Sequence, residues 1–298
     1  EIDVVCFGDG EKDLPKIISD FELNGLFTPV DGYYFREYKY KDYSFISKLP
    51  DTNINDIKFA DYSLFEKEHY KWDKLPVIAS RGCVNRCSFC NEWNCWKRYQ
   101  FRSPERIFEE VLFQKEQNPQ MKKFWLSCSN LSGDIKSLED LCNKFIESGI
   151  NISWESQLGI RKEIDNKFLK MLKDSGCDYL HFGLESGSSK VLRLMNKTYE
   201  RNLAAKVLKE TFKSNINFNF NIIVGFPGET SIDFIKTLLF IRKFLYCNIA
   251  PSVAICNIPI NSALYKHPKK YGINFTNNTW YVNNPINTLE IRQLRYKY

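Results

Sequence analysis

The chain has 298 residues, of which 43% are apolar, so it is long enough to bury one large core with a small appended unit. Lys and Arg outnumber Asp and Glu by 42 to 36, and the basic residues are scattered along the sequence. The sequence contains no Lys/Arg-rich tract of the kind that binds nucleic acid, so a nucleic-acid substrate is not indicated. No apolar run has the length of a membrane span, and no signal peptide is seen at the start of the chain. Ten cysteines, three clustered and the rest isolated, are typical of reduced thiols in the cytoplasm.

The first 30 residues predict one strand and one helix. Residues 1–7 are typical of a buried strand, residues 8–11 (GDGE) of a turn, and residues 14–23 of an amphipathic helix that ends at Gly25. One strand and one helix cannot form a core alone, and no initiating Met is present. We therefore expect residues 1–30 to be the remnant of an N-terminal α/β domain.

Residues 31–74 are expected to connect this remnant to the next domain. Asp31-Gly32, followed by an aromatic run that ends at Tyr40, indicates a short hairpin. A long extended stretch then leads to an aromatic cluster that ends at Trp72. Loops of this length are uncommon unless they are functional or link domains. We expect the aromatic residues to pack against the domain that follows.

From residue 75 short apolar runs alternate with helical stretches, which predicts βα units and a parallel sheet. The runs cover residues 75–80, 123–128, 150–158, 179–183, 218–224 and 249–258. Six units within residues 75–265 are fewer than the eight of a closed TIM barrel. The predicted fold is therefore α/β, a partial (βα)6 TIM-like barrel, with residues 266–298 as an incomplete C-terminal extension. Right-handed crossovers place the loops after the strands on one rim, where barrel active sites lie.

Cap residues set the expected helix bounds. Ser103-Pro104 opens the first helix, and a helix from Ser137 ends at Gly149. The next helix starts after Asp165 and stops at Gly176. Three more helices are expected at residues 188–195, 202–214 and 230–246, the last with Thr230 and Asp233 as a capping pair.

Three cysteines follow the first apolar run directly. Cys83, Cys87 and Cys90 have a C-x3-C-x2-C spacing. Three thiolates on a short loop can hold three corners of an iron–sulfur cube and leave one iron open to a ligand. Structural zinc needs four ligands, and only His69 and Cys95 lie nearby. A non-catalytic iron–sulfur or zinc module, serving as scaffold or electron carrier, is the alternative hypothesis.

The run CVNRCSFC resembles the signature loop of the radical S-adenosylmethionine (SAM) superfamily. The resemblance implies that Cys83, Cys87 and Cys90 hold a [4Fe–4S] cluster, that SAM binds its open iron, and that Phe89 lies beside the adenine. It implies an open six-unit barrel and an oxygen-sensitive enzyme that cleaves SAM to a 5′-deoxyadenosyl radical. The implied partners are SAM, a substrate that the sequence does not identify, and a low-potential electron donor of flavodoxin or ferredoxin type.

The fourth strand leads into the segment GLESGS, which contains Glu185 and Ser186. A structural reading is that Ser186 or Ser188 caps the next helix and Gly187 permits the turn. A functional reading places Glu185 at the rim, facing hydroxyl or ammonium groups. GxESGS is similar to the family segment that contacts the ribose and methionine moiety of SAM, which implies this role for Glu185 and Ser186.

The fifth strand leads into a glycine-containing turn. Gly225 and Pro227 leave the backbone uncovered, so that a flat ring can approach the strand edge, and a glycine inside a strand often marks such an approach. The segment resembles the GxIxGxxE adenine-contact motif of the family. Asn221 replaces its first glycine, and Glu229 falls one place later than the motif's Glu.

Two further residues are candidates at the rim. Arg161, after the third strand, could clamp the SAM carboxylate with its bidentate fork, or could be an ordinary solvated Arg. Cys128 stands where relatives with this run tend to carry Asp. Its thiol could donate a hydrogen atom to a substrate radical, or could simply pack, as free Cys usually does.

The GDGE turn is similar to the GEGE turn that closes the cobalamin-binding domain in a large subgroup of the family, with Asp9 where Glu is usual. The cobalamin-ligand motif D-x-H-x-x-G is absent, because none of the three His residues fits it. Cobalamin is therefore expected only with the missing N-terminal domain. The sequence leaves open whether the reaction is methylation, rearrangement or oxidation.

Overall fold

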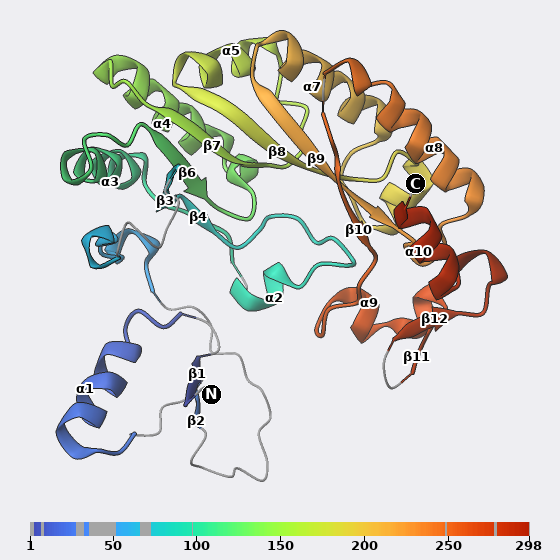
Figure 1. Ribbon diagram of the computed structural model, residues 1–298, viewed down its shortest axis with the longest axis horizontal. Coiled ribbons are helices and arrows are strands. Elements are labelled where there is room, and N and C mark those ends of the chain that lie inside the picture. The colour runs from blue at the N-terminus through green and yellow to red at the C-terminus, as the bar shows by residue number, and fades with distance from the viewer. Residues whose placement is uncertain are drawn as a thin grey trace.

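The computed structural model describes residues 3–6, 9–27, 33–35, 52–65, 73–96, 98–247, 249–276 and 279–297. Its centre is a curved sheet of six parallel strands whose spatial order follows the chain (Figure 1). These strands are β3 (Leu75–Ile78), β6 (Lys123–Ser127), β7 (Ser153–Leu158), β8 (Cys177–Glu185), β9 (Asn217–Val224) and β10 (Ser252–Ile255). Within the described residues β3 and β10 each pair with one neighbour, so the barrel is open. The predicted α/β partial barrel is confirmed.

Helices that follow the strands cover the outer side of the sheet (Figure 1). They are α3 (Pro104–Gln117), α4 (Ile135–Ser148), α5 (Asn166–Asp174), α7 (Arg201–Lys213) and α8 (Ser231–Arg242), and the short helix α6 (Ser189–Leu194) lies between β8 and α7 in the chain. The predicted caps hold at Ser103, Asp165 and Thr230, whose side chains accept backbone N–H groups of the next turn. Helix α4 begins before Ser137, because Asp134 is its N-cap and accepts the Ser137 N–H (3.1 Å).

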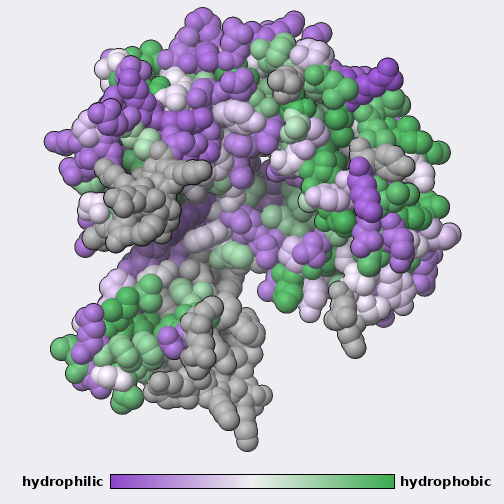
Figure 2. Space-filling view, viewed as in Figure 1, coloured by the Kyte–Doolittle hydropathy of each residue, from purple (hydrophilic) through white to green (hydrophobic). Residues whose placement is uncertain are grey.

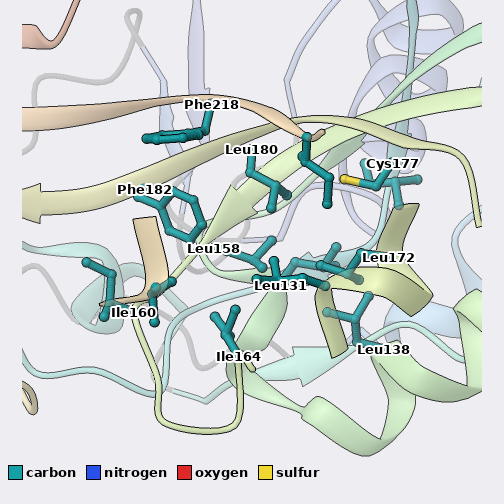
Figure 3. Packing of buried hydrophobic residues seen from close by; sticks show 14 of the residues in the cluster. Leu131, Leu138, Leu158, Ile160, Ile164, Leu172, Cys177, Leu180, Phe182 and Phe218 are labelled. Carbon is teal, nitrogen blue, oxygen red and sulfur yellow. The ribbon is translucent and has the colours of Figure 1, made fainter. Parts of the chain in front are cut away.

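The core lies between the sheet and these helices. Alternate strand residues such as Leu158, Leu180 and Phe182 point outward and meet Leu138 and Leu172 of the helices (Figure 3). Each such side chain stabilises the fold by about 1.5–3 kcal/mol when fully buried. Because the helices cover one face only, residues of opposite parity face the concave side of the barrel.

The connector runs along the first barrel helix. Its short helical turns at Ile54–Asp56 and Tyr62–Leu64 lie beside α3. The Tyr62 hydroxyl donates to the Pro76 carbonyl (2.6 Å), and Phe59 packs on Phe113 (5.5 Å between ring centroids). These contacts agree with the expectation that connector aromatics pack against the barrel.

The N-terminal unit contains β1 (Val4–Cys6), α1 (Leu14–Asn24) and β2 (Tyr33–Phe35), and Gly25 ends α1 as predicted. β2 pairs antiparallel with β1. The other residues of the expected hairpin, and Trp72, lie outside the described residues.

After β10 the chain forms α9 (Ala263–Lys266), a ribbon of β11 (Ile273–Phe275) and β12 (Trp280–Val282), and α10 (Leu289–Lys297). On the face of the molecule shown in Figure 1 and Figure 2, hydrophilic residues cover much of the surface, and hydrophobic residues gather on the side where α8 lies. None of the helices in the described ranges combines the length and apolar character needed to cross a bilayer.

Candidate functional site: a cysteine loop at the barrel rim

The cysteine loop leaves the sheet after β3 and is closed at its base by a small ribbon. β4 (Ser80–Arg81) pairs antiparallel with β5 (Gln100–Phe101). Gly82 enters the loop at φ +74°, in the left-handed region. A Cβ atom at Gly82 would overlap the Arg98 carbonyl oxygen, so a residue with a side chain would force the two sides of the base apart.

Backbone amides of the loop point at two of its sulfurs. The Asn85 N–H donates to Cys83 Sγ (3.4 Å), and the Glu92 N–H donates to Cys90 Sγ (3.4 Å). Burial raises the pKa of Cys90 to about 11, and the neighbouring thiols of Cys87 and Cys83 contribute to the rise. Backbone groups of the loop thus hold the sulfurs of Cys83 and Cys90, and the role of the three cysteines as cluster ligands stays a prediction.

Two helices grip the middle of the loop. The Ser88 N–H donates to the Met195 carbonyl (3.0 Å), and its hydroxyl donates to the Leu194 carbonyl (3.1 Å), both at the end of α6. On the other side the Leu264 N–H of α9 donates to the Ser88 carbonyl (3.0 Å). Contacts from residues more than 100 positions away thus fix the loop between Cys87 and Cys90.

Glu185 ends β8 in a strained backbone conformation. Its φ is +71°, and the register between β8 and β9 shifts between Phe182 and Glu185. A left-handed residue with a side chain costs about 1–2 kcal/mol. Such strain persists where the surroundings over-determine it, which is most often at a functional site.

A buried lysine stands between Glu185 and the cysteine loop. The Lys197 ammonium lies 3.2 Å from the Glu185 carboxylate, and their side chains are only 8% and 9% exposed. It also donates to the Gly183 carbonyl (3.0 Å) and lies 5.4 Å from the centre of the Phe89 ring. Burial disfavours the ammonium form, but the Glu185 carboxylate outweighs it and raises the pKa of Lys197 well above its usual range. Lys197 is thus a fixed positive charge beside the loop.

The loop follows the first strand of an open parallel barrel, and the buried pair follows the fourth. A family model described as the radical SAM superfamily matches residues 77–241, more than half of the chain. The chain belongs to the radical SAM superfamily. Members are enzymes that use a [4Fe–4S] cluster and SAM, and these are the cofactors of this family member.

The alignments with similar proteins span most of this chain but only about half of each relative. It is 26% identical over 250 residues to "Uncharacterized methyltransferase PH0819" of Pyrococcus horikoshii, covering 81% of this chain and 53% of that protein. It is 24% identical over 242 residues to the anaerobic magnesium-protoporphyrin IX monomethyl ester cyclase of Rubrivivax gelatinosus, covering 77% and 43%. tRNA-2-methylthio-N(6)-dimethylallyladenosine synthases of Clostridium botulinum match as well, at 27% identity over 212 residues for one strain, covering 67% and 47%. The chain spans about half the length of the relatives it matches.

Among solved structures the fold is similar to that of TsrM from Kitasatospora setae, a radical SAM methyltransferase determined with tryptophan and a SAM analogue. The TM-score is 0.58 at 16% identity, and the match covers 70% of this chain and 41% of that one. At 16% identity this similarity establishes only that the two proteins share the barrel fold.

Three cysteines on one short loop are a donor set that a [4Fe–4S] cluster accepts, because each thiolate binds a different iron. A structural zinc ion needs four ligands, with thiolates at about 2.3 Å from one point. In the part of the chain that the structure describes, no three His, Cys, Asp or Glu side chains converge on one metal position. The ligand role of Cys83, Cys87 and Cys90 stays a prediction.

Lys197 is the site residue that the sequence analysis missed. It lies after α6, in the turn Met195-Asn196-Lys197, and its side chain returns to the end of β8. A lone Lys one turn beyond a helix carries no local signal of burial. The available clue was Asn196 before it, since Asn tolerates the left-handed φ of +59° that redirects the chain.

Ser186 points away from the loop. Its hydroxyl lies 3.2 Å from that of Thr237 on α8 and accepts the Ser188 N–H (3.1 Å). The Ser188 hydroxyl in turn donates to Asp233 (2.8 Å). Ser188 is the N-cap residue of α6, but its side chain makes no cap bond, so the expected capping is not seen. The contacts fasten the GLESGS turn to α8 instead, and the SAM contact of Ser186 stays a prediction.

Gly225 lies under the C-terminal helix. It has φ +77°, and a Cβ atom there would overlap the aliphatic part of Arg292 in α10. The Asn287 amide donates to the carbonyls of Gly225 (3.2 Å) and Phe226 (3.1 Å). Pro227, in the same turn, is buried. The missing side chain at Gly225 is therefore required by a contact within the protein, and the adenine contact of Gly225 and Pro227 stays a prediction.

Arg161 holds the loop after β6. Its guanidinium donates to the carbonyls of Ser132 (2.8 Å) and Gly133 (3.4 Å) and lies 3.5 Å from the Glu163 carboxylate. The side chain is one-third exposed. Part of the Arg161 guanidinium is thus already hydrogen-bonded to backbone carbonyls, and its contact with the SAM carboxylate stays a prediction.

Cys128 is turned toward the outer side of the sheet. Its sulfur lies 3.2 Å from the Ser156 hydroxyl and donates to the Gln157 carbonyl (3.5 Å). Ser156 is fully buried among the residues that face the helices. Burial raises the pKa of the Cys128 thiol to about 11. These contacts agree with the packing role, and the hydrogen-donor role stays a prediction.

The GDGE turn reaches the base of the cysteine loop. Arg81 bonds Asp9 (3.0 Å) and Glu11, and its guanidinium lies 4.9 Å from the centre of the Trp96 ring. Burial raises the pKa of Asp9 against the opposing charge of Arg81. The N-terminal unit is thereby tied to the residue that precedes Gly82.

A row of polar residues crosses the concave face below the loop. Gln157, His181 and Asn219 are paired in register across β7, β8 and β9, and the Asn219 amide donates to Ser252 on β10 (3.3 Å). Trp125 packs edge-on against the His181 ring (5.2 Å between centroids). Burial lowers the pKa of His181. This face can offer neutral hydrogen-bonding groups to a bound molecule.

Proposed function

We propose that this chain is the catalytic barrel of a radical SAM enzyme, with SAM bound between the cysteine loop and the Glu185–Lys197 pair. The observation that carries the proposal is the buried Lys197, which contacts Glu185 and lies over the Phe89 ring. A fixed cation, a buried carboxylate and an aromatic face beside a three-cysteine loop match the charges of SAM. Its carboxylate is negative, its amino group positive and its adenine flat.

Cys83, Cys87 and Cys90 would ligate the cluster through thiolates, and metal binding must overcome the raised pKa of Cys90. When bound, the cluster and SAM supply the reaction: one electron cleaves the sulfonium C–S bond to methionine and a 5′-deoxyadenosyl radical, which abstracts hydrogen from the substrate. The protein's own part is to hold the reactants and exclude water, because a primary radical attacks any C–H bond in reach.

Lys197 and Glu185 orient the SAM methionine moiety in this proposal. The ammonium can share its charge between the Glu185 carboxylate and a ligand carboxylate, and Glu185 can accept hydrogen bonds from hydroxyl or ammonium groups. Neither side chain has room to reorient, since both are more than nine-tenths buried. The pair is therefore preorganised for its ligand.

The substrate lies against the polar row of the concave face. Gln157, His181 and Asn219 present an amide, an imidazole and a second amide side by side, and Trp125 adds a flat apolar surface. A molecule with several hydrogen-bonding groups and a planar part fits this lining.

Cobalamin enters the proposal only for a longer protein. Structures of TsrM and of OxsB, another radical SAM enzyme with a similar barrel, are described as cobalamin-bound, and the chain covers 38% and 30% of them. The contact of Arg81 with the GDGE turn supplies a link through which an N-terminal cobalamin domain would reach the cluster loop. In that setting the reaction is a methylation or a rearrangement.

The electron comes from a low-potential donor of flavodoxin or ferredoxin type in the cytoplasm. The described residues include all ten cysteines, and none of them forms a disulfide, which suits a reducing compartment.

Anaerobic reconstitution with iron and sulfide tests the proposal. We expect a [4Fe–4S] spectrum that changes when SAM is added, and release of 5′-deoxyadenosine after reduction with dithionite. Cys83→Ala should abolish both signals. Cys95→Ala is the matched control, because Cys95 is exposed five residues beyond the last ligand and should leave both intact.

A cluster whose spectrum does not change when SAM is added would favour the non-catalytic electron carrier. Binding of one zinc ion with no iron–sulfur spectrum would favour the zinc scaffold. Either result overturns the enzymatic proposal.

A further inference from the structure

A cavity of about 430 Å³ borders the cysteine loop and is also lined by residues of α6 and α9. Its lining includes Arg86, Trp93, Arg193, His267, Lys270 and Tyr271. Cationic and aromatic side chains thus make up most of the cavity lining.

The loop itself forms one side of the cavity. Arg86 stands between Cys83 and Cys87 in the sequence and donates to the Cys83 carbonyl (3.0 Å). Ser88, which also lines the cavity, stands between Cys87 and Cys90. The backbone that carries the cluster ligands is therefore the floor of a surface cavity.

Positive charge concentrates around this floor. Trp93 has two cations over its ring, Arg86 at 5.2 Å and Lys266 at 5.4 Å from the ring centre. From Pro251 to Thr276 the sequence contains three lysines and no Asp or Glu. Glu200 is paired with Arg193 (2.9 Å), and both side chains are more than half exposed. Basic side chains gathered around an aromatic surface attract an acidic partner by electrostatic complementarity.

The rim favours a protein over a small anion. Lys266, His267 and Lys270 are exposed on the outer face, while Trp93 and Tyr271 supply aromatic area. Tyr, Trp and Arg are the residues enriched in protein interfaces. The cations are spread over the rim instead of converging on one point, as a single phosphate would require.

We propose that this basic cavity and its rim, residues 86, 93, 193, 266, 267 and 270, dock the acidic flavodoxin-type protein that reduces the cluster. The inference rests on the proposed function, because it needs a cluster behind the loop. One electron passes from the flavin hydroquinone, which becomes the semiquinone, to the cluster, which goes from the 2+ to the 1+ state. Electrostatic steering toward the rim sets the rate of encounter.

The test compares two double charge reversals that change the net charge equally. Lys266→Glu/Lys270→Glu alters the rim, and Lys136→Glu/Lys170→Glu alters exposed sites on α4 and α5. We would measure cluster reduction by flavodoxin hydroquinone in stopped flow over a range of salt, and binding of oxidised flavodoxin to metal-free protein. The rim variant should slow reduction at least 10-fold at low salt and flatten the salt dependence, with a parallel loss of binding.

Dithionite separates this inference from the proposed function. Dithionite should reduce the rim variant as fast as the wild type and should still release 5′-deoxyadenosine from SAM. If wild-type protein releases none with dithionite, the proposed function fails, whatever flavodoxin does.

Three results overturn the docking inference. They are reduction of the rim variant by flavodoxin at the wild-type rate, slowing of the α4/α5 variant by the same factor, and slower reduction of the rim variant by dithionite. Binding of tRNA that the rim variant loses, without any flavodoxin binding, would instead assign the surface to nucleic acid.

Discussion

Two buried glutamates at the ends of neighbouring strands have different surroundings. Glu185 follows β8 and pairs with Lys197, which also lies over Phe89. Glu229 follows β9 and accepts from Arg295 of α10 (2.8 Å) and from the Gly225 N–H (2.7 Å). One pair faces the cysteine loop, and the other is enclosed between the barrel and its C-terminal helix.

Backbone strain distinguishes the two positions. Glu185 adopts φ +71° itself, at a cost that a glycine there would avoid. In the Glu229 turn the left-handed positions are taken by Gly225 and Gly228. The strained residue that keeps its side chain motivates a hypothesis of function for Glu185, whereas Gly225 and Gly228 adopt the same left-handed conformation without that cost.

The largest effect is expected from Lys197→Met. It leaves the Glu185 carboxylate buried without its cation, and breaking a buried pair in this way costs about 3–5 kcal/mol. The SAM-induced change in the cluster spectrum should disappear. Lys197→Arg keeps the charge and should retain part of the SAM response.

The double variant Glu185→Gln/Lys197→Met separates folding from ligand binding. It removes the unpaired charge, so the thermal midpoint should recover while the SAM response stays lost. Recovery of both would contradict a role of the pair in binding SAM.

Glu229 should give the stability of the fold a pH dependence. Burial raises the pKa of Glu229 to about 7, although Gly225 and Arg295 pull it down. Because the folded pKa lies above the unfolded value of 4.5, the carboxyl stabilises the fold below pH 4.5, and this stabilisation is lost as pH rises through 7. Against Glu229→Gln, the wild type should lose about 1.4 kcal/mol per pH unit between pH 5 and 7 and level off above 8.

Urea unfolding of both proteins across this range measures the difference. Parallel profiles would mean that Arg295 keeps the Glu229 carboxylate ionised throughout. In that case the surroundings of Glu229 would not make the stability of the fold depend on pH.

A smaller effect distinguishes two glycines of the Glu229 turn. Gly225 and Gly228 both have positive φ, so Ala costs about 1–2 kcal/mol at either position. At Gly225 the new methyl also overlaps Arg292, which adds about 1–3 kcal/mol of overpacking, whereas at Gly228 it meets only the tip of Leu194 at 3.0 Å. The free energy of unfolding in urea should therefore fall further for Gly225→Ala. Equal losses would mean that α10 is not seated on Gly225 in solution.

The sequence was sufficient for features that depend on local pattern. The six strands, the caps at Ser103, Asp165 and Thr230, and the C-x3-C-x2-C loop each leave a signal within a few residues. Sequence reasoning did not reveal the partners of those features. Lys197, Arg295 and the Asp9–Arg81 contact meet their partners only after the chain has folded back, and a single charged residue carries no mark of its burial.

The smallest effect is expected from Cys128→Ala, at a residue where two roles were open. Its sulfur is held by the Ser156 hydroxyl (3.2 Å) on the side of the sheet that faces the helices. Removing it should cost about 1 kcal/mol, typical of one lost hydrogen bond, and should leave 5′-deoxyadenosine release unchanged. Once a substrate is found, the ratio of products should also be unchanged, because a thiol turned toward the core cannot reach a radical on the concave face. A changed ratio, with normal stability and SAM cleavage, would instead mean that Cys128 reaches the substrate, and would extend the reactive region beyond Glu185 and Lys197 to the end of β6.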